Sequence, residues 1–201
     1  LRFPNPQAMT RFRRSILDLH AVTWLTARHW IRPWLPWLFL LGVVAAISGI
    51  AAEQDGDWWD VEVSFALSAM IHAVFKLWMA NEAPRQFLED RRTGAMELLL
   101  STPLTAAEIL AGHSRGLRRQ FLGPVVVVLL VDFYWMVTGG MEERTGGVPT
   151  LAVLWLLRMI LLVLDLWTLK WAGFWAGMTG RGRATTTSLV FRVLVLPWLL
   201  W

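Results

Sequence analysis

Apolar residues along this chain fall into long runs that are separated by short polar segments. A helix needs about 20 such residues to cross the roughly 30 Å hydrocarbon core of a bilayer, and the runs are close to that length. We therefore expect an all-α, polytopic membrane protein. The five runs that predict transmembrane helices are 33–52, 58–80, 121–138, 150–178 and 185–201.

One polar segment, 84–119, is much longer than the other breaks and predicts a helical hairpin. Its first helix is expected over 84–100, because a proline at the first position of a helix loses no hydrogen bond. The residue before a proline avoids the helical region, so Ser101-Thr102-Pro103 is expected to end this helix.

The second helix of the hairpin has a strong start signal at Thr105. Thr105 and Glu108 have the spacing of a capping box, in which each side chain binds the backbone N–H of the other residue. Leu104 and Ile109 have the spacing of the hydrophobic staple that accompanies such a box. These signals predict a helix start but no chemistry, and by themselves they suit a solvated connector equally well.

The segment 1–32 precedes the first apolar run and is rich in arginine. Phe12, Ile16 and Leu19 share one helical face, and arginine combined with tryptophan suits a helix that lies in the headgroup zone. We expect an interfacial helix here; the alternative is a soluble helix packed on the hairpin. The continuous apolar core of a cleavable signal peptide is absent from these residues.

The composition supports a membrane protein. Of the 201 residues, 56% are hydrophobic and 17% are charged, and the mean hydropathy is +0.47, which is unusual for a soluble domain. The sequence has no cysteine, so disulfides and thiolate chemistry are excluded. The isoelectric point near 10.6 could suggest nucleic acid, but membrane topology explains the basic residues better, and we expect no nucleic-acid partner.

Basic residues are concentrated in alternate polar segments. Six of the 19 Lys and Arg lie in 1–32, six in 81–119 and two in 179–184, whereas the turns 53–60 and 139–149 hold one between them. Short loops rich in Lys and Arg stay in the cytoplasm. We therefore expect a cytoplasmic N-terminus and a cytoplasmic hairpin.

Three charged residues inside the predicted spans are candidates for function: Asp132, Arg158 and Asp165. A charge at the bilayer centre costs about 2.5–3.5 kcal/mol on insertion scales, so it normally faces protein or water. Counted from the outer ends of their spans, Asp132 and Arg158 both lie roughly 10–12 Å deep, which predicts an ion pair. The functional interpretation is a polar lining for a transport path, and the alternative is a pair that only stabilises helix packing.

No other set of residues predicts catalysis. The four histidines include no i, i+4 pair, so we expect no metal. The glycines of 177–182 have phosphate-loop spacing but lack the required Lys and Ser/Thr, so we expect no ATP site and no other cofactor. Serine, histidine and aspartate are too dispersed to predict a hydrolase triad, and we expect that the chain is not an enzyme.

The hairpin contains the most specific motif of the chain. The stretch EDRRTGAMELLLSTPLTAAEIL, followed by RRQF, resembles the cytoplasmic loop of permease subunits in the type 2 ABC exporter family. The resemblance covers about a sixth of the chain, and the order of apolar runs agrees with the family. It implies that the loop couples the permease to a separate ATPase subunit through Glu89, Asp90, Arg91, Arg92, Thr93, Gly94, Glu97, Leu98, Pro103 and Leu104.

The resemblance also implies the partners and the location. They are a cytoplasmic ATP-binding subunit, a second permease subunit and membrane lipids, in the inner membrane of a bacterium. The chain begins without methionine and stops inside the apolar run 194–201, so we expect both ends to be incomplete. The family has a sixth span, which would follow the fifth run. The expected domains are an N-terminal segment, 1–32, and a transmembrane domain, 33–201. The function expected is ATP-driven export, and the alternative is a structural subunit of a larger membrane assembly that does not transport.

Overall fold

The structure is a computed structural model that describes residues 34–53, 61–101, 105–142 and 150–180. Every regular element in this part of the chain is a helix, as the apolar runs predict. The expected interfacial helix in 1–32 and the fifth span, 185–201, lie outside the described residues. The helices are α3 (Leu35–Glu53), α4 (Val61–Arg92), α5 (Ala95–Leu100), α6 (Ala106–Glu142) and α7 (Thr150–Thr179).

Three helices of the described chain are long and apolar enough to cross a membrane, which indicates an integral membrane protein. Their candidate spans are Glu62–Arg92, Ala106–Thr138 and Ala152–Thr179. The first predicted span corresponds to α3, which is apolar but shorter than these three. The structure therefore confirms the all-helical class, while the prediction of five spans extends beyond the described residues.

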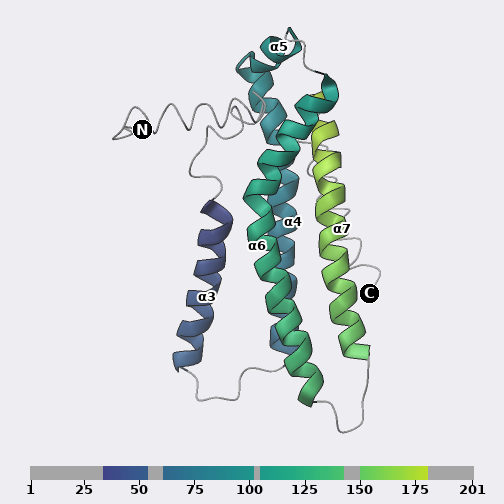
Figure 1. Ribbon diagram of the computed structural model, residues 1–201. Helices are drawn as coiled ribbons and strands as arrows, with labels where there is room; N and C mark the ends of the chain where they lie inside the picture. The colour runs from purple at the N-terminus through teal and green to yellow at the C-terminus, as the bar shows by residue number, and fades with distance from the viewer. Residues whose placement is uncertain (1–33, 54–60, 102–104, 143–149, 181–201) are drawn as a thin grey trace, which may run out of the picture.

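The long helices α4, α6 and α7 lie side by side, with α3 along the other side of α6 (Figure 1). Along α4 and α7, Phe65 contacts Trp155 and Phe87 contacts Phe174, so these two helices run in the same direction. On α6, His113 stacks on Phe87 whereas residues later in α6 contact earlier parts of α4, so α6 is antiparallel to both. The end of the bundle that carries α5 therefore also holds the end of α7.

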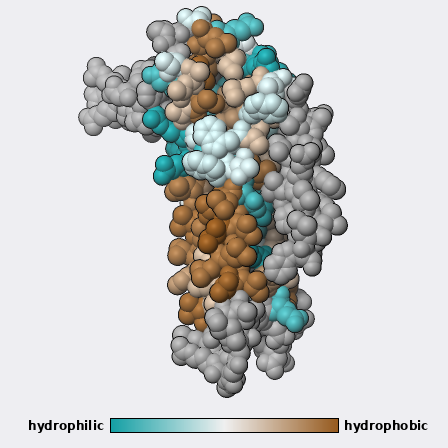
Figure 2. All heavy atoms as spheres, turned by 90° about the vertical axis from the view of Figure 1, so that its right-hand side faces the viewer, coloured by the Kyte–Doolittle hydropathy of each residue, from teal (hydrophilic) through white to brown (hydrophobic). Residues whose placement is uncertain are grey.

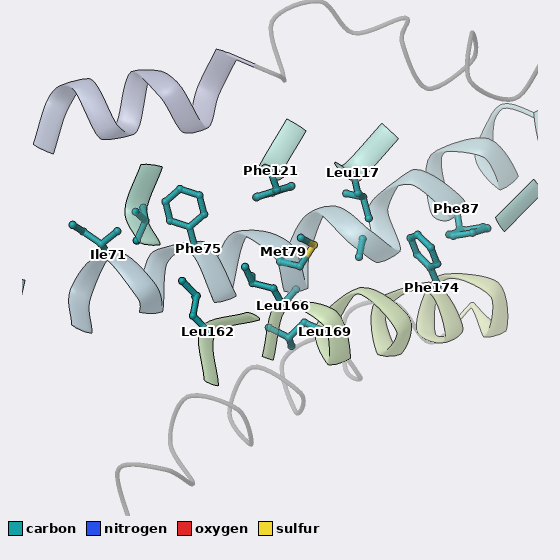
Figure 3. Packing of buried hydrophobic residues seen from close by; sticks show 13 residues of the cluster. Ile71, Phe75, Met79, Phe87, Leu117, Phe121, Leu162, Leu166, Leu169 and Phe174 are labelled. Carbon is teal, nitrogen blue, oxygen red and sulfur yellow. The ribbon is translucent and has the colours of Figure 1, made fainter. Parts of the chain in front are cut away.

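A ladder of buried apolar side chains joins the three long helices (Figure 3). Aromatic edges meet ring faces along it, with centroid distances of 6.5 Å for Phe75–Phe121 and 5.1 Å for Phe87–Phe174. Leu162 and Leu169 of α7 are buried in the same cluster. Because many other large apolar side chains of these helices point outward, the bundle has the apolar exterior that a bilayer requires (Figure 2).

Helices α7 and α4 approach each other closely at Gly173 and Gly177 of α7. A Cβ atom on Gly173 would lie 2.6 Å from the Cβ of Ala83, and a Cβ atom on Gly177 would lie 2.8 Å from the carbonyl oxygen of Pro84. This four-residue spacing of glycines lets two backbones come together, as small residues do at helix interfaces in membranes. It rigidly joins α7 to α4 near the α5 end.

The structure corrects the expected start of a new helix at Pro84. Pro84 lies inside α4, which runs unbroken from the membrane region to Arg92. An interior proline removes one backbone hydrogen bond, but close packing against Gly173 and Gly177 supports the helix at this point. The predicted helix over 84–100 is therefore wrong in its start, and it is also interrupted at Gly94, where φ is 72°.

The predicted capping box at Thr105 is confirmed. The backbone N–H of Thr105 donates to Glu108 Oε2 at 2.8 Å, and the N–H of Glu108 donates to Thr105 Oγ1 at 3.3 Å. The helix that begins here does not end at 119, since α6 continues through Pro124 to Glu142. The predicted second hairpin helix and third span are thus one helix. Leu104 of the expected staple lies outside the described residues.

Candidate functional site

Polar groups gather at two places in the bundle. The first is the tip formed by the last turns of α4, the short helix α5 and the first turns of α6 (Figure 1). The second is a set of polar contacts inside the bundle, among α4, α6 and α7. We refer to them below as the tip and the polar column.

The tip begins where α4 ends. The N–H of Thr93 donates to the carbonyl of Glu89, and Gly94 then adopts the left-handed conformation that commonly follows a helix. A side chain at Gly94 would meet no steric obstacle, but the positive φ disfavours any residue other than glycine. Gly94 therefore allows the sharp turn from α4 into α5.

Helix α5 presents apolar side chains to the exterior. The exposed fractions of Leu98 and Leu100 are 71% and 70%, the two largest among the exposed large apolar residues of the described chain. Glu97, Arg91, Arg92 and Thr93 are also exposed, so most predicted coupling residues are accessible. Pro103 and Leu104 lie outside the described residues.

Asp90 makes a close contact with a buried side chain, whereas Glu89 lies 4.0 Å from the exposed Arg85 on its own helix. Its Oδ2 lies 2.8 Å from Nε2 of His113, whose side chain is fully buried. The other ring nitrogen of His113 is 2.9 Å from the carbonyl oxygen of Ile109, and the ring stacks on Phe87 at 4.2 Å. Asp90 thus joins the end of α4 to α6, and its side chain is largely shielded.

The polar column is built on one face of α4. Ser68, His72 and Lys76 are four residues apart, so they follow one another along that face. Asp132 of α6 meets the first two: Ser68 Oγ donates to its Oδ1 at 2.6 Å, and His72 Nε2 lies 2.7 Å from its Oδ2. All three of these side chains are buried, with exposed fractions of 6% or less. The carboxylate of Asp132 is therefore fully satisfied by α4.

The third member of the face, Lys76, pairs with α7. Its Nζ lies 2.6 Å from Oδ2 of Asp165, and both side chains are largely shielded. Asp165 lies two helical turns after Arg158 on α7, and both side chains contact α4. Lys76 and Asp165 extend the column from the α6 side of α4 to its α7 side.

The expected ion pair between Asp132 and Arg158 is wrong. Arg158 Nη1 donates to the backbone carbonyl of Phe65 at 2.8 Å, and its guanidinium carbon lies 4.2 Å from the centre of the Phe65 ring. Depth in the membrane, from which the pair was predicted, does not decide which helix faces which. In the structure, Asp132 contacts His72, and Arg158 donates to the backbone carbonyl of Phe65.

The polar column links α4 to α6 and α7 through hydrogen bonds and an ion pair. Ser68 donates to Asp132 and not to His72, so the histidine is not arranged as a base for a serine nucleophile. Within the described residues, no group of three or more His, Cys, Asp or Glu side chains could hold a metal ion. What the column does provide is a set of hydrogen bonds between helices that would have to break if α6 or α7 moved along α4.

Sequence reasoning missed both histidines as partners of aspartate. The signal was present in the hairpin: two antiparallel helices bring together residues placed symmetrically about their connection. Asp90–His113 and His72–Asp132 are both centred on residues 101–102, close to the break at Ser101. If α4 and α6 are aligned as antiparallel helices that are symmetric about that break, both contacts are predicted.

No protein-family model, no curated protein and no solved structure matches this chain.

Proposed function

We propose that this chain is the membrane-spanning permease subunit of an ATP-driven exporter of the type 2 ABC kind, and that its tip binds a separate ATPase subunit. The observation that carries the proposal is the exposure of Leu98 and Leu100 on α5. Two almost fully exposed leucines on a short helix outside the apolar part of the bundle are typical of a surface that a protein partner covers.

The lengths of the flanking helices support a tip that projects from the membrane. At 1.5 Å per residue, the 32 residues of α4 extend about 48 Å and the 37 residues of α6 about 55 Å. A bilayer has a hydrocarbon core of about 30 Å, so each helix exceeds it by about 20 Å. The polar ends of α4 and α6 meet at α5, which agrees with a tip in water.

The contacts around the tip favour transmission of force. The Asp90–His113 bond joins α4 to α6, and Gly173 and Gly177 pack α7 against α4. Movement imposed on α5 would therefore displace the ends of three helices together. Deeper in the bundle, this movement would strain the bonds of Asp132 and the Lys76–Asp165 pair.

We propose two protein partners for this chain. A nucleotide-binding subunit would supply ATP hydrolysis, and a second permease copy or relative would complete the transport path. Exposed arginines of the described chain gather at the tip end, at Arg91, Arg92, Arg115, Arg118 and Arg119, which favours a cytoplasmic tip and hence a cytoplasmic N-terminus. The inner membrane of a bacterium is the compartment that this family resemblance favours.

The test is whether variants of the tip still capture an ABC-type ATPase subunit that co-purifies with the unaltered protein. Leu98→Ser with Leu100→Ser should leave the melting temperature in detergent unchanged, because both side chains are exposed. Capture of the ATPase should fall by tenfold or more if the two leucines are buried at the interface, at about 1 kcal/mol or more for each. Leu130→Ser on the outward face of α6 is the control, and it should not affect capture.

Unchanged capture by the double variant would overturn the coupling role. It would favour the alternative, a structural subunit in a larger membrane assembly. An ATPase that is captured equally well by a protein without residues 95–100 would have the same consequence.

A further inference from the structure

Lys170 of α7 lies in a setting unlike that of the other charged residues in the bundle. Its Nζ is 3.4 Å from Ser114 Oγ on α6. The same ammonium lies over two indole rings of its own helix, 4.0 Å from the centre of Trp167 and 4.6 Å from that of Trp171. Hydroxyl and rings orient the ammonium, but neither neutralises its charge.

Lys76 and Arg158 have partners of a kind that Lys170 does not have among the described residues. Lys76 has a carboxylate partner in Asp165, and Arg158 has a backbone carbonyl. Among the described residues, Lys170 contacts no carboxylate and no carbonyl oxygen. A positive charge near the hydrocarbon region normally has an anionic partner or reaches the headgroups, and the described residues supply no anion to Lys170.

A second positive charge lies close by, on Arg118. Arg118 follows Ser114 by one helical turn and is exposed, and its charge acts on Lys170. No ion pair of Arg118 occurs within the part of the chain that the structure describes. Among the described residues neither cation has an acidic partner, and Ser114, which accepts from Lys170, lies one helical turn before Arg118 on α6.

This place lies at the level of the lipid headgroups. The continuous apolar run of α6 begins at Phe121, so Arg118 and Ser114 are about 5 Å and 10 Å beyond the edge of the hydrocarbon core. Trp167 and Trp171 are 60% and 44% exposed on the adjoining face of α7, as in the aromatic belt at a membrane boundary. Figure 2 shows pale and teal side chains toward this end and the brown apolar face on the side away from it.

We propose that the surface formed by Ser114 and Arg118 of α6 and Lys170 of α7 binds the headgroup phosphate of an anionic phospholipid. The ammonium and guanidinium neutralise the phosphate, and the Ser114 hydroxyl donates a hydrogen bond to it. The exposed indoles contact the glycerol and the upper acyl chains. A lipid suits the site better than free phosphate because the cations open onto an apolar, indole-lined face, where an acyl chain has a favourable place to lie. The proposal does not depend on ATPase coupling.

The experiment measures lipid retention by the purified full chain. Native mass spectrometry and a thermal melt in detergent are carried out with phosphatidylglycerol, phosphatidylcholine or inorganic phosphate at equal concentration. The unaltered protein should retain phosphatidylglycerol and melt at a higher temperature with it than with phosphatidylcholine. Arg118→Gln and Lys170→Gln should each weaken phosphatidylglycerol binding about fivefold, as expected for one basic side chain at an anionic headgroup.

Two comparisons make the outcome decisive. Arg92→Gln removes one exposed positive charge at the tip, away from Lys170 and Ser114, and should retain the lipid as the unaltered protein does. Arg118 is exposed, so Arg118→Gln tests the site even if Lys170→Gln does not fold. Equal binding of phosphatidylcholine, undiminished lipid binding by Arg118→Gln, an equal loss with Arg92→Gln, or full stabilisation by inorganic phosphate would each overturn the proposal.

Discussion

The imidazole of His72 on α4 and the carboxylate of Asp132 on α6 lie 2.7 Å apart inside the bundle. Ser68, one turn before His72, occupies the other oxygen of the same carboxylate. Two helices that the chain connects through an exposed tip are therefore joined again deep between their apolar surfaces. Sliding of α4 relative to α6 has to break these two bonds. The two helices therefore move together as long as the bonds hold.

The His72–Asp132 bond predicts a coupled response to mutation. Asp132→Leu alone should destabilise the protein by about 3 kcal/mol or more, because it leaves the polar atoms of His72 and Ser68 buried without their acceptor. Adding His72→Leu should recover part of the loss. A double-mutant cycle on thermal or denaturant stability in detergent measures the recovery. The coupling of Asp132 with Arg158 should be smaller, and a larger value there would contradict the pairing.

Gly173 should not tolerate a side chain. A Cβ atom there would lie 2.6 Å from the Cβ of Ala83 and 3.0 Å from Cδ of Pro84, so Gly173→Ala should force α7 away from α4. Overpacking of this kind costs about 1–3 kcal/mol. The matched control is Gly49→Ala in α3, where a Cβ atom meets nothing within 4 Å. Equal melting temperatures for the two variants would show that the glycine contact does not hold the helices together.

The Asp90–His113 bond should contribute to the fold of the tip. Asp90→Ala leaves the buried Nε2 of His113 without its partner, which should cost about 1–3 kcal/mol. Glu97→Ala removes an exposed acid of the same tip and should change stability by less than about 0.5 kcal/mol. Hydrogen exchange of the first turns of α6 measures the local effect. Identical protection in both variants would contradict a structural role for Asp90.

The acids of the tip test docking separately from folding. Glu89→Arg with Glu97→Arg should leave the protein folded and inserted, yet prevent capture of the ATPase and ATP-dependent transport, because reversed charges disfavour a complementary surface. Glu62→Arg is the control, since it makes the same change on an exposed residue at the opposite end of α4. A pull-down beside a thermal melt gives the result, and capture equal to that of the control would argue against docking at the tip.

The membrane topology can be read with reporter fusions. Fusions within 53–60 and 139–149 should report an extracytoplasmic position, and one at Gly94 a cytoplasmic position, because Lys and Arg are concentrated on the Gly94 side. A cytoplasmic signal from a fusion at Gly56 would invert the orientation and exclude docking of a cytoplasmic ATPase at the tip.

Local sequence determined the features of this protein that depend on neighbouring residues. The long apolar runs specify helices, because in a bilayer every backbone group must be bonded within its own segment. The capping box at Thr105 formed as its spacing predicts, since both of its bonds join residues three positions apart. Helical class, membrane character and the start of α6 therefore needed no tertiary information.

The tertiary structure decided where helices end and which polar groups meet. Pro84 has a local preference for a helix start, but it remains inside α4 because Gly173 and Gly177, about 90 residues later, offer a surface on which that stretch packs. Asp132 had several possible partners at its depth, and its choice of His72 over Arg158 follows from the register of α4 against α6. Register depends on the fit of whole helix surfaces, so these partners can be identified only from the packed structure.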